Sequence, residues 1–248
     1  MAMPMFPLGS VLLPRMPLSL RLFEPRYLLM LQHVLAQDVP EFGVVLIERG
    51  REVGGGDSRF RTGTVARIAQ VAMGDDAVAL TAIGTRRIVI DRWLDDDPWP
   101  RAEVSELPEL SVVGSGEALA STGLRVRRSL ARAAEFGEAD WPADVELSED
   151  PEIAAWQLAG VAPISTIDRY ELLAAATLAD LLEGLDRALE HADAVREAPA
   201  PGGALEAELA ELLGDAVGED EGDAGDADGE PDDDPDADPD PGGAPRAG

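Results

Sequence analysis

Three closely spaced prolines near the N-terminus constrain this chain more than any other feature of its sequence. Pro7, Pro14 and Pro17 interrupt the short apolar runs of residues 5–23. Each proline fixes its φ angle and lacks a backbone N–H, so this spacing excludes a helix and predicts extended strands with bends. Pro25 instead suits the first turn of a helix. The residues after Pro25 predict one apolar helical face, formed by Tyr27, Met30, Leu31, Val34 and Leu35.

Residues 41–104 contain short apolar runs separated by turn residues. Residues 44–47 form a continuous apolar run, which is typical of a strand buried on both faces. A glycine-rich loop at residues 54–57 and a turn at residues 73–76 separate the later runs. The further strands are expected at residues 64–71, 77–83, 88–90 and 101–104. This pattern predicts a small barrel or folded sheet rather than an α/β layer.

From residue 117 the apolar spacing becomes helical. The first expected helix carries a cluster of arginines: Arg125, Arg127, Arg128 and Arg132. Capping residues mark the starts of the later helices. They are Asp150 before Pro151, Ser165 or Thr166, and Thr177 with Asp180. A leucine stripe at positions 178, 181, 182, 185 and 189 follows the last of these caps and predicts a buried helix face.

The composition changes again after residue 197. Residues 198–248 contain seventeen acidic side chains, one arginine and no aromatic residue. Such a segment buries too little apolar surface to offset its chain entropy, so we expect a disordered tail. The sequence therefore predicts three parts, namely a β-rich domain at 1–110, a helical subdomain at 111–197 and an acidic tail at 198–248.

Two residue types that carry much of enzyme chemistry are absent from the sequence. It has no cysteine and no lysine, and arginine supplies all twenty basic side chains. Thiol nucleophiles, disulfides and cysteine-based zinc sites are therefore excluded. His33 and His191 show no spacing typical of metal ligands, so each is expected to be a surface or interfacial residue of a helix. We expect no cofactor and no metal site.

The apolar runs are too short to span a bilayer. The N-terminus has no basic region followed by an uninterrupted apolar stretch, so it does not resemble a secretory signal. We therefore expect a cytoplasmic protein that does not enter the membrane.

Five blocks of the first hundred or so residues resemble the N-terminal, substrate-binding domain of Lon protease. They are Phe-Glu-Pro-Arg-Tyr at 23–27, residues 42–45, Gly-Thr-Val-Ala-Arg-Ile at 63–68, residues 82–88, and Pro-Trp-Pro-Arg-Ala-Glu-Val at 98–104. The resemblance implies a PUA-like β pseudo-barrel followed by a small helical domain, hence an α+β fold. Residues 150–196 resemble the helical region of that family more loosely.

A complete Lon protease would also need a P-loop lysine for ATP and a serine–lysine pair for peptide cleavage. This chain has no lysine, and a guanidinium remains protonated and cannot act as the base. The chain is also too short for the ATPase and peptidase domains. We therefore expect a standalone, noncatalytic member of the family.

Four side chains are candidates for contacting a bound peptide, with no catalytic residue among them: Arg26, Arg86, Trp99 and Trp141. Arg26 either pairs with a peptide carboxylate or carbonyl at a groove or forms a structural pair with Glu24. Arg86 and Arg87 are neighbours on an expected strand, so one is predicted to point outward and one inward. A structural role is the alternative for both.

The tryptophans have similar alternatives. Trp93 and Trp99 flank the acidic residues 95–97, where exposed aromatic side chains would suit extended peptides. Trp93 is expected to pack in the core, whereas for Trp99 both environments stay open. Trp141 lies in a connecting loop, where it either covers the seam between barrel and helices or lines a groove there.

The resemblance implies a peptide- or protein-binding module. Its partners would be unfolded or specific client proteins, and a separate protease if it acts as an adaptor rather than as a holdase-like binder. The alternative is RNA binding, which PUA-like barrels of other families perform. A net charge of −29 opposes nucleic-acid binding. The arginine cluster at residues 125–132 is the local exception, and the acidic tail could dock there instead.

Overall fold

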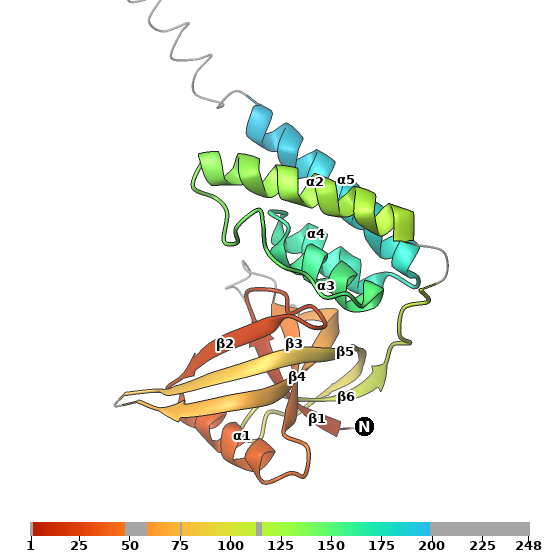
Figure 1. Cartoon of the computed structure of the whole chain (residues 1–248). Coiled ribbons are helices and arrows are strands. Elements are labelled where there is room, and N and C mark those ends of the chain that lie inside the picture. Colours follow the sequence, from red (N-terminus) through yellow and green to blue (C-terminus); the bar gives the residue numbers. More distant parts are fainter. Residues whose placement is uncertain (1, 48–58, 75, 113–115, 199–248) are drawn as a thin grey trace, which may run out of the picture. The chain divides into compact units, whose positions relative to one another are not determined.

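The computed structural model describes residues 2–47, 59–74, 76–112 and 116–198 (Figure 1). Within these residues the chain forms first a β-rich part and then a helical part. The β-rich part contains β1 (Ala2–Leu8), β2 (Pro17–Leu22), α1 (Pro25–Leu35), β3 (Glu41–Ile47), β4 (Arg59–Met73), β5 (Val78–Leu94) and β6 (Arg101–Glu106). The helical part contains α2 (Gly116–Glu135), α3 (Pro151–Val161), α4 (Thr166–Glu171), the short 3-10 helix η1 (Leu172–Ala174) and α5 (Leu178–Glu197). This arrangement confirms the predicted α+β class.

Five of the strands close into a barrel. The sheet order is β2-β5-β4-β3-β1-β6, and β5 also pairs with β6. Closure depends on the 17-residue length of β5. Its first half pairs with β2 and its second half with β6, while β4 runs along its other edge. The strand β2 is therefore an addition outside the closed ring. The sequence predicted two separate strands at residues 77–83 and 88–90, whereas β5 is one continuous strand.

Pro4 and Pro7 lie in β1, a strand whose pairing partner changes along its length. Residues 2–4 of β1 pair with β6, and residues 5–8 pair with β3. Each half of β1 thus has one edge without a strand partner, which makes a missing N–H tolerable. Pro25 is at the start of α1, as predicted.

The apolar face of α1 packs on the barrel core through Tyr27, Met30, Leu31 and Val34. The prediction for Leu35 is wrong, because this side chain is exposed at the last position of the helix. Leu124 on α2 is also exposed. It lies two positions, or about 200°, from the buried Val126, which turns it away from the core.

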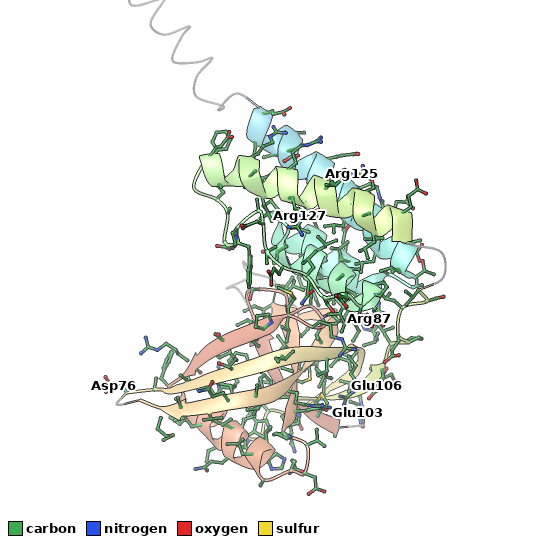
Figure 2. All side chains as sticks on the ribbon, viewed as in Figure 1. Asp76, Arg87, Glu103, Glu106, Arg125 and Arg127 are labelled. Carbon is green, nitrogen blue, oxygen red and sulfur yellow. The ribbon has the colours of Figure 1, made fainter. Side chains whose placement is uncertain are left out.

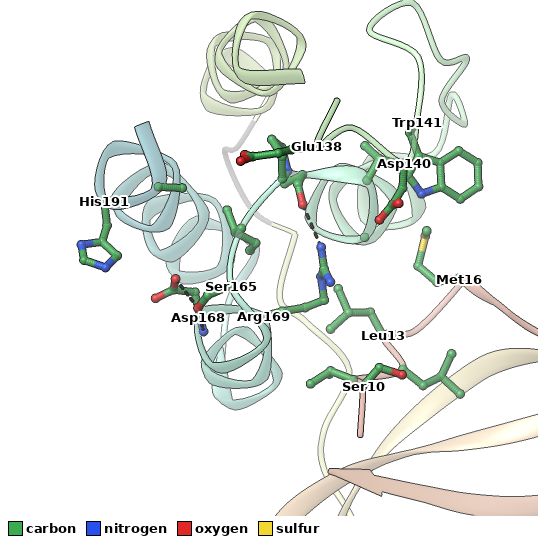
Figure 3. Close-up of a pocket in the computed structure, with 18 of the residues that line it drawn as sticks. Ser10, Leu13, Met16, Glu138, Asp140, Trp141, Ser165, Asp168, Arg169 and His191 are labelled. Atoms are coloured by element: carbon green, nitrogen blue, oxygen red, sulfur yellow. Dashed lines mark hydrogen bonds between the residues drawn. The ribbon is translucent and has the colours of Figure 1, made fainter. Parts of the chain in front are cut away.

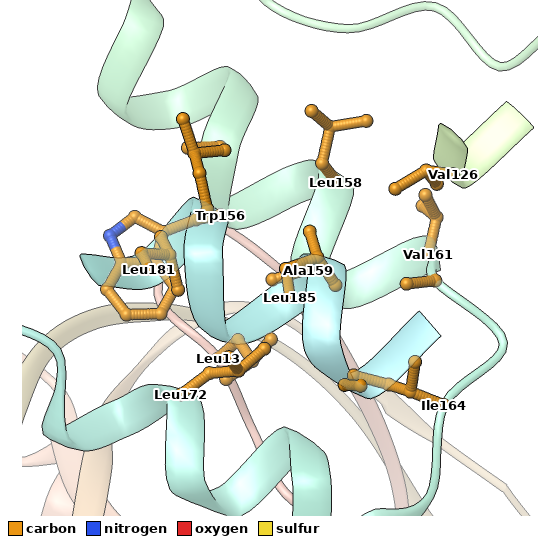
Figure 4. Close-up of a cluster of buried hydrophobic side chains, with 14 of the residues drawn as sticks. Leu13, Val126, Trp156, Leu158, Ala159, Val161, Ile164, Leu172, Leu181 and Leu185 are labelled. Atoms are coloured by element: carbon orange, nitrogen blue, oxygen red, sulfur yellow. The ribbon is translucent and has the colours of Figure 1, made fainter. Parts of the chain in front are cut away.

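The helical part has a separate apolar core (Figure 4). Trp156 of α3 lies at its centre and is 1% exposed. The predicted leucine stripe of α5 is buried in this core. All three predicted caps form: Asp150 accepts from the backbone of α3, Ser165 from that of α4, and Thr177 with Asp180 makes a capping box at α5.

One buried side chain ties the barrel to the helices. Arg87 of β5 is 5% exposed and lies where the strands meet the helical part (Figure 2). Its Nη1 donates to the carbonyl oxygens of Leu173 and Ala175 at 2.8 and 2.5 Å, and its Nη2 donates to that of Pro108 at 2.5 Å. The guanidinium also lies over the Trp156 ring, 5.5 Å from its centroid. The neighbouring Arg86 is partly buried and pairs instead with Glu41 and Glu106, so the alternation of the two side chains stays a prediction.

Residues 1–198 form one compact unit, which contains both the barrel and the helices. The predicted division at residue 110 therefore stays an interpretation of the chain. The glycine-rich loop at 54–57, residue 75 of the predicted turn, and the acidic tail from residue 199 lie outside the described residues. None of the helices in the described ranges combines the length and the apolar character needed to cross a membrane.

Replacement of Arg87 tests whether this side chain links the barrel to the helical part. Arg87→Met leaves three carbonyl oxygens without their donor, so we expect the free energy of unfolding to fall by about 2–4 kcal/mol. Arg87→Lys keeps the charge but lacks the planar fork, so its effect should be smaller. Urea unfolding followed by circular dichroism measures both variants. Parent-like stability of the methionine variant would contradict this role.

The contact between α2 and α5 gives a prediction about pH. Burial raises the pKa of Asp186, and Glu190 adds to this effect, whereas the hydrogen bond from Thr122 and the charge of Arg125 oppose it. An acid with a raised folded-state pKa binds more protons when folded, so its contribution to stability falls as pH rises through that window. Asp186→Asn should therefore gain stability relative to the parent as pH rises from about 4, levelling off above the folded-state pKa. Urea unfolding at several pH values measures this difference, and a difference that shrinks with rising pH would contradict it.

Candidate functional site

A cavity of about 780 Å³ opens between the segment that joins β1 to β2 and the helical part (Figure 3). We call it the interlobe groove. One wall consists of residues 10–13 and 16–18. The opposite wall comes from three places in the helical part, namely residues 138–141 between α2 and α3, residues 160–169 from the end of α3 into α4, and residues 191–196 in the last turns of α5.

The β1–β2 segment is held in place because adjacent leucines enter different cores. Leu12 packs in the barrel core and is 5% exposed, whereas Leu13 packs in the helical core and is 1% exposed. Figure 4 shows Leu13 among the helical residues. The groove wall is therefore fixed from both sides.

Gly84 of β5 anchors the same segment through its backbone. Its carbonyl accepts from Arg15 N–H at 2.7 Å, and its N–H donates to the Met16 carbonyl at 2.9 Å. A Cβ at residue 84 would collide with the Leu13 carbonyl oxygen, so this close approach requires glycine. Arg15 itself has a φ of 66°, in the left-handed region, which completes the turn into β2.

Charged groups brace the helical wall. Arg196 pairs with Glu138 at 3.0 Å and with Asp193 at 3.1 Å, and it also donates to the Pro163 carbonyl. Arg169 donates through Nη2 to the Ala162 carbonyl at 2.8 Å. These bonds link the ends of α3 and α5 to the intervening segments, so the groove is a built feature of the fold.

Arg169 also gives the groove a partly desolvated cation. Its Nε is buried and has no hydrogen-bond partner. Burial lowers the pKa of Arg169, and the nearby Asp140 carboxylate opposes this shift. Both Arg169 and Asp140 line the groove, beside the apolar side chains of Met16, Trp141 and Val195. The groove surface thus combines apolar side chains with opposite charges close together, which suits a polypeptide better than a polyanion.

The described residues contain no group of three or more histidine, aspartate or glutamate side chains placed to hold a metal ion. His191 lies at the groove and is exposed. His33 is exposed on α1, and its ring lies 5.2 Å from that of Trp99.

The four predicted peptide-binding residues do not form one site. Trp141 lines the interlobe groove with 37% of its surface exposed. Arg26 pairs with Glu24 at 2.9 Å beside a smaller cavity of about 260 Å³. Arg86 pairs with Glu41 at 2.7 Å and with Glu106 at 2.6 Å.

Trp99 packs against the barrel core with its indole N–H buried. Trp93 packs against a second cluster in the barrel, as expected. The structure thus brings one of the four candidates, Trp141, to the interlobe groove. A role in peptide binding stays a prediction for all four.

Sequence reasoning missed the residues that shape the groove, above all Arg169 and the segment 10–16. Arg169 follows the predicted cap Ser165 within the first turns of α4, but nothing in the local pattern shows that its side chain faces a cavity. The adjacent residues Leu12 and Leu13 could have indicated that this segment lies between two apolar cores. In an extended segment, neighbouring apolar residues point to opposite sides and therefore require two apolar partners.

The arginine cluster of α2 is largely engaged within the protein. Arg125 pairs with Asp186, and Arg132 pairs with Glu197. Arg127 donates to the carbonyl oxygens of Ala143 and Val145 at 2.9 and 3.0 Å. Figure 2 labels Arg125 and Arg127 on this helix. Acidic side chains of α5 thus already neutralise much of the surface on which the RNA-binding alternative depended.

Solved structures with a similar fold define the structural class. The Lon N-terminal domain protein from Xanthomonas campestris is 28% identical, with a TM-score of 0.53 over 75% of this chain and 98% of that one. The N-terminal domain of the Mycobacterium avium complex Lon protease has a TM-score of 0.55 over 77% of this chain and 98% of that one. At 17% identity, this second likeness concerns the fold alone.

The family follows from the sequence model. The model of the ATP-dependent protease La (Lon) substrate-binding domain matches residues 2–191, which include the barrel and nearly all of the helical part. The chain therefore belongs to this family, and the resemblance noted in the sequence is confirmed. Membership indicates a role in substrate recognition. A comparison with curated proteins gave no match.

The contact between Gly160 and Met16 across the groove can be tested by mutation. Met16 occupies the space that a Cβ at residue 160 would need. Alanine normally stabilises a helix interior relative to glycine by about 1 kcal/mol. We expect Gly160→Ala instead to destabilise the protein by about 1–3 kcal/mol, because Met16 must move.

The same substitution combined with Met16→Ala should recover much of this loss in a double-mutant cycle. Gly123→Ala in α2 is the matched control, because a Cβ there would meet Leu158 at an ordinary 3.8 Å. Thermal and urea unfolding measure the stability of Gly160→Ala, Met16→Ala, their combination and Gly123→Ala. Equal effects of the substitutions at residues 123 and 160, with no coupling to Met16, would contradict the contact.

Proposed function

We propose that this chain binds segments of other polypeptides in the interlobe groove and has no catalytic step of its own. The observation that carries the proposal is that both apolar cores and three charge-assisted links fix the walls of this groove. A preformed, partly apolar cavity lowers the entropy lost when an unfolded segment binds. Membership of a substrate-binding domain family supports the same reading.

The binding step would serve either of two roles. As an adaptor, the protein would present clients to a separate protease, and as a holdase-like binder it would keep them from aggregating. Both roles need the same groove, so its occupancy is the first point to establish. Trp141 and Val195 are the exposed apolar side chains that we expect to contact the client.

The test uses labelled, reduced and alkylated α-lactalbumin, a permanently unfolded and acidic protein. Because this chain has a net charge of −29, charge attraction does not account for any binding that occurs. We expect fluorescence anisotropy to detect binding that Trp141→Ser and Val195→Ser each weaken by about tenfold, a loss of about 1.4 kcal/mol. Phe136→Ser is the matched control, since Phe136 is 63% exposed but does not line the groove.

Equal binding by the parent and both groove variants would overturn the proposal. The same assay with a labelled single-stranded RNA tests the alternative function. Three of the four arginines of α2 are engaged within the protein and the net charge is negative, so we expect no RNA binding at physiological salt. Binding that weakens steeply with added salt would instead favour RNA recognition.

A further inference from the structure

The strand β2 offers a free edge beside the groove. It pairs with β5 on one side, and among the described residues no strand pairs with its other side. Ser19 and Arg21 are exposed along it, as is Pro17 at its start. An unpaired strand edge presents N–H and C=O groups at regular spacing, which an extended peptide can match.

The direction of each backbone group follows from the ladder with β5. Antiparallel neighbours exchange hydrogen bonds at alternate residues. Gly84 N–H donates to the Met16 carbonyl, and Pro17 lies opposite Ile83. The backbone groups of residues 18, 20 and 22 therefore face β5, and those of residues 17, 19 and 21 face outward.

The outward-facing backbone groups of β2 are available for pairing with another strand. Within the described part of the chain, the backbone of Ser19 and Arg21 makes no hydrogen bond across this side. Pro17 occupies an outward position, where its missing N–H removes no bond to β5. The next two outward residues each retain a donor and an acceptor.

The two faces of β2 define which side chains an added strand should carry. Leu18 and Leu20 are partly buried against the barrel core. Side chains opposite them would extend this apolar core. Ser19 and Arg21 face solvent, and Arg21 has no acidic partner among the described residues. A matching segment would alternate apolar and polar residues, with an acidic side chain opposite Arg21.

The edge is continuous with the interlobe groove, because Met16, Pro17 and Leu18 form part of the groove wall. A strand added along β2 would therefore have one end in the groove. The sheet has a second free edge at the outer end of β4, since pairing with β3 ends at Arg67 whereas pairing with β5 continues to Met73. No residue of that end lines the groove.

A second copy of this chain is a poor occupant of the edge. Each copy has a net charge of −29, and two such molecules repel one another. The lack of an N–H at Pro17 also shortens the ladder that two β2 strands could make. A segment of a different polypeptide avoids the first of these penalties.

We propose that β2 binds its client by strand addition. The occupant is an extended polypeptide segment with alternating apolar and polar side chains and an acidic residue opposite Arg21. It pairs with the outward backbone groups of Ser19 and Arg21, and one end enters the interlobe groove. This inference rests on the proposed function and specifies how the client is held.

The test uses capped synthetic peptides about eight residues long, in which leucine and valine alternate with threonine and one glutamate. Two N-methylated versions block the N–H groups of either the apolar or the polar positions. One version loses the hydrogen bonds to β2 and the other keeps them. Fluorescence anisotropy should therefore show that the affinity of one version alone falls by about tenfold or more. The identity of the weakly binding version shows whether the peptide runs parallel or antiparallel to β2.

Substitutions in the protein give an independent readout. Ser19→Pro removes an outward N–H and should weaken binding of the unmodified peptide by a similar factor. Met73→Pro is the matched control: the ladder with β5 places Ala72 opposite Ala79, so the backbone of Met73 faces the other free edge. We expect it to bind like the parent, with circular dichroism confirming that both variants fold.

The outcomes separate this proposal from the one before it. Equal losses for both N-methylated peptides would overturn strand addition. If unfolded α-lactalbumin still binds in a groove-dependent way, the proposed function would stand. If neither the peptides nor α-lactalbumin bind, both proposals fail. A dimer of the parent that Ser19→Pro dissolves would assign the edge to a second copy and overturn the inference.

Discussion

The relation between barrel and helices depends on one buried guanidinium. Arg87 comes from a barrel strand, yet its three acceptors lie in the segment after β6 and in the short stretch around η1. It also contacts Trp156, the central side chain of the helical core. Burial lowers the pKa of Arg87, and the charge of Glu152 opposes this effect. The guanidinium still remains charged, because the ordinary pKa of arginine is so high. Its carbonyl bonds therefore keep their charge-assisted strength in a site with little water.

The groove follows from this connection. Once Arg87 sets the helical part on the barrel, the segment between β1 and β2 runs along the seam, with Leu12 in one core and Leu13 in the other. Gly84 lets the segment approach β5, and the turn at Arg15 directs it into β2. One short segment thus forms both the groove wall and the start of the free strand. The groove and the edge share their geometry, which is why a single client segment can use both.

The sequence predicted those features that depend on local physics. Proline positions excluded a helix before residue 25, and Asp150, Ser165 and Thr177 marked helix starts because capping bonds form within a few residues. The leucine stripe of α5 showed its buried face for the same local reason. The exposure of Leu35 was missed because it depends on where the helix ends and on which side its neighbour packs.

The site was harder to predict because its parts are distant in sequence. Arg169, Met16 and Val195 meet through tertiary packing, and no local spacing encodes that meeting. The same holds for Arg87, since the sequence predicted alternation with Arg86 but not three carbonyl acceptors more than twenty residues away. Family resemblance predicted the barrel and a role in substrate recognition, whereas the groove is evident only from the three-dimensional structure.

Exclusive use of arginine explains how so acidic a chain builds this site. Arg87, Arg127, Arg169 and Arg196 all donate to backbone carbonyls, a task for which a planar, multi-donor group is better suited than an ammonium. These four arginines bind groups within the fold and contribute little positive charge to the surface, which is therefore strongly acidic. Arg15 and Arg21 remain exposed around β2. An acidic surface repels polyanions and other copies of the chain. Recognition at the strand edge then depends on backbone hydrogen bonds and apolar contacts, which are the features an unfolded client displays and a folded protein hides.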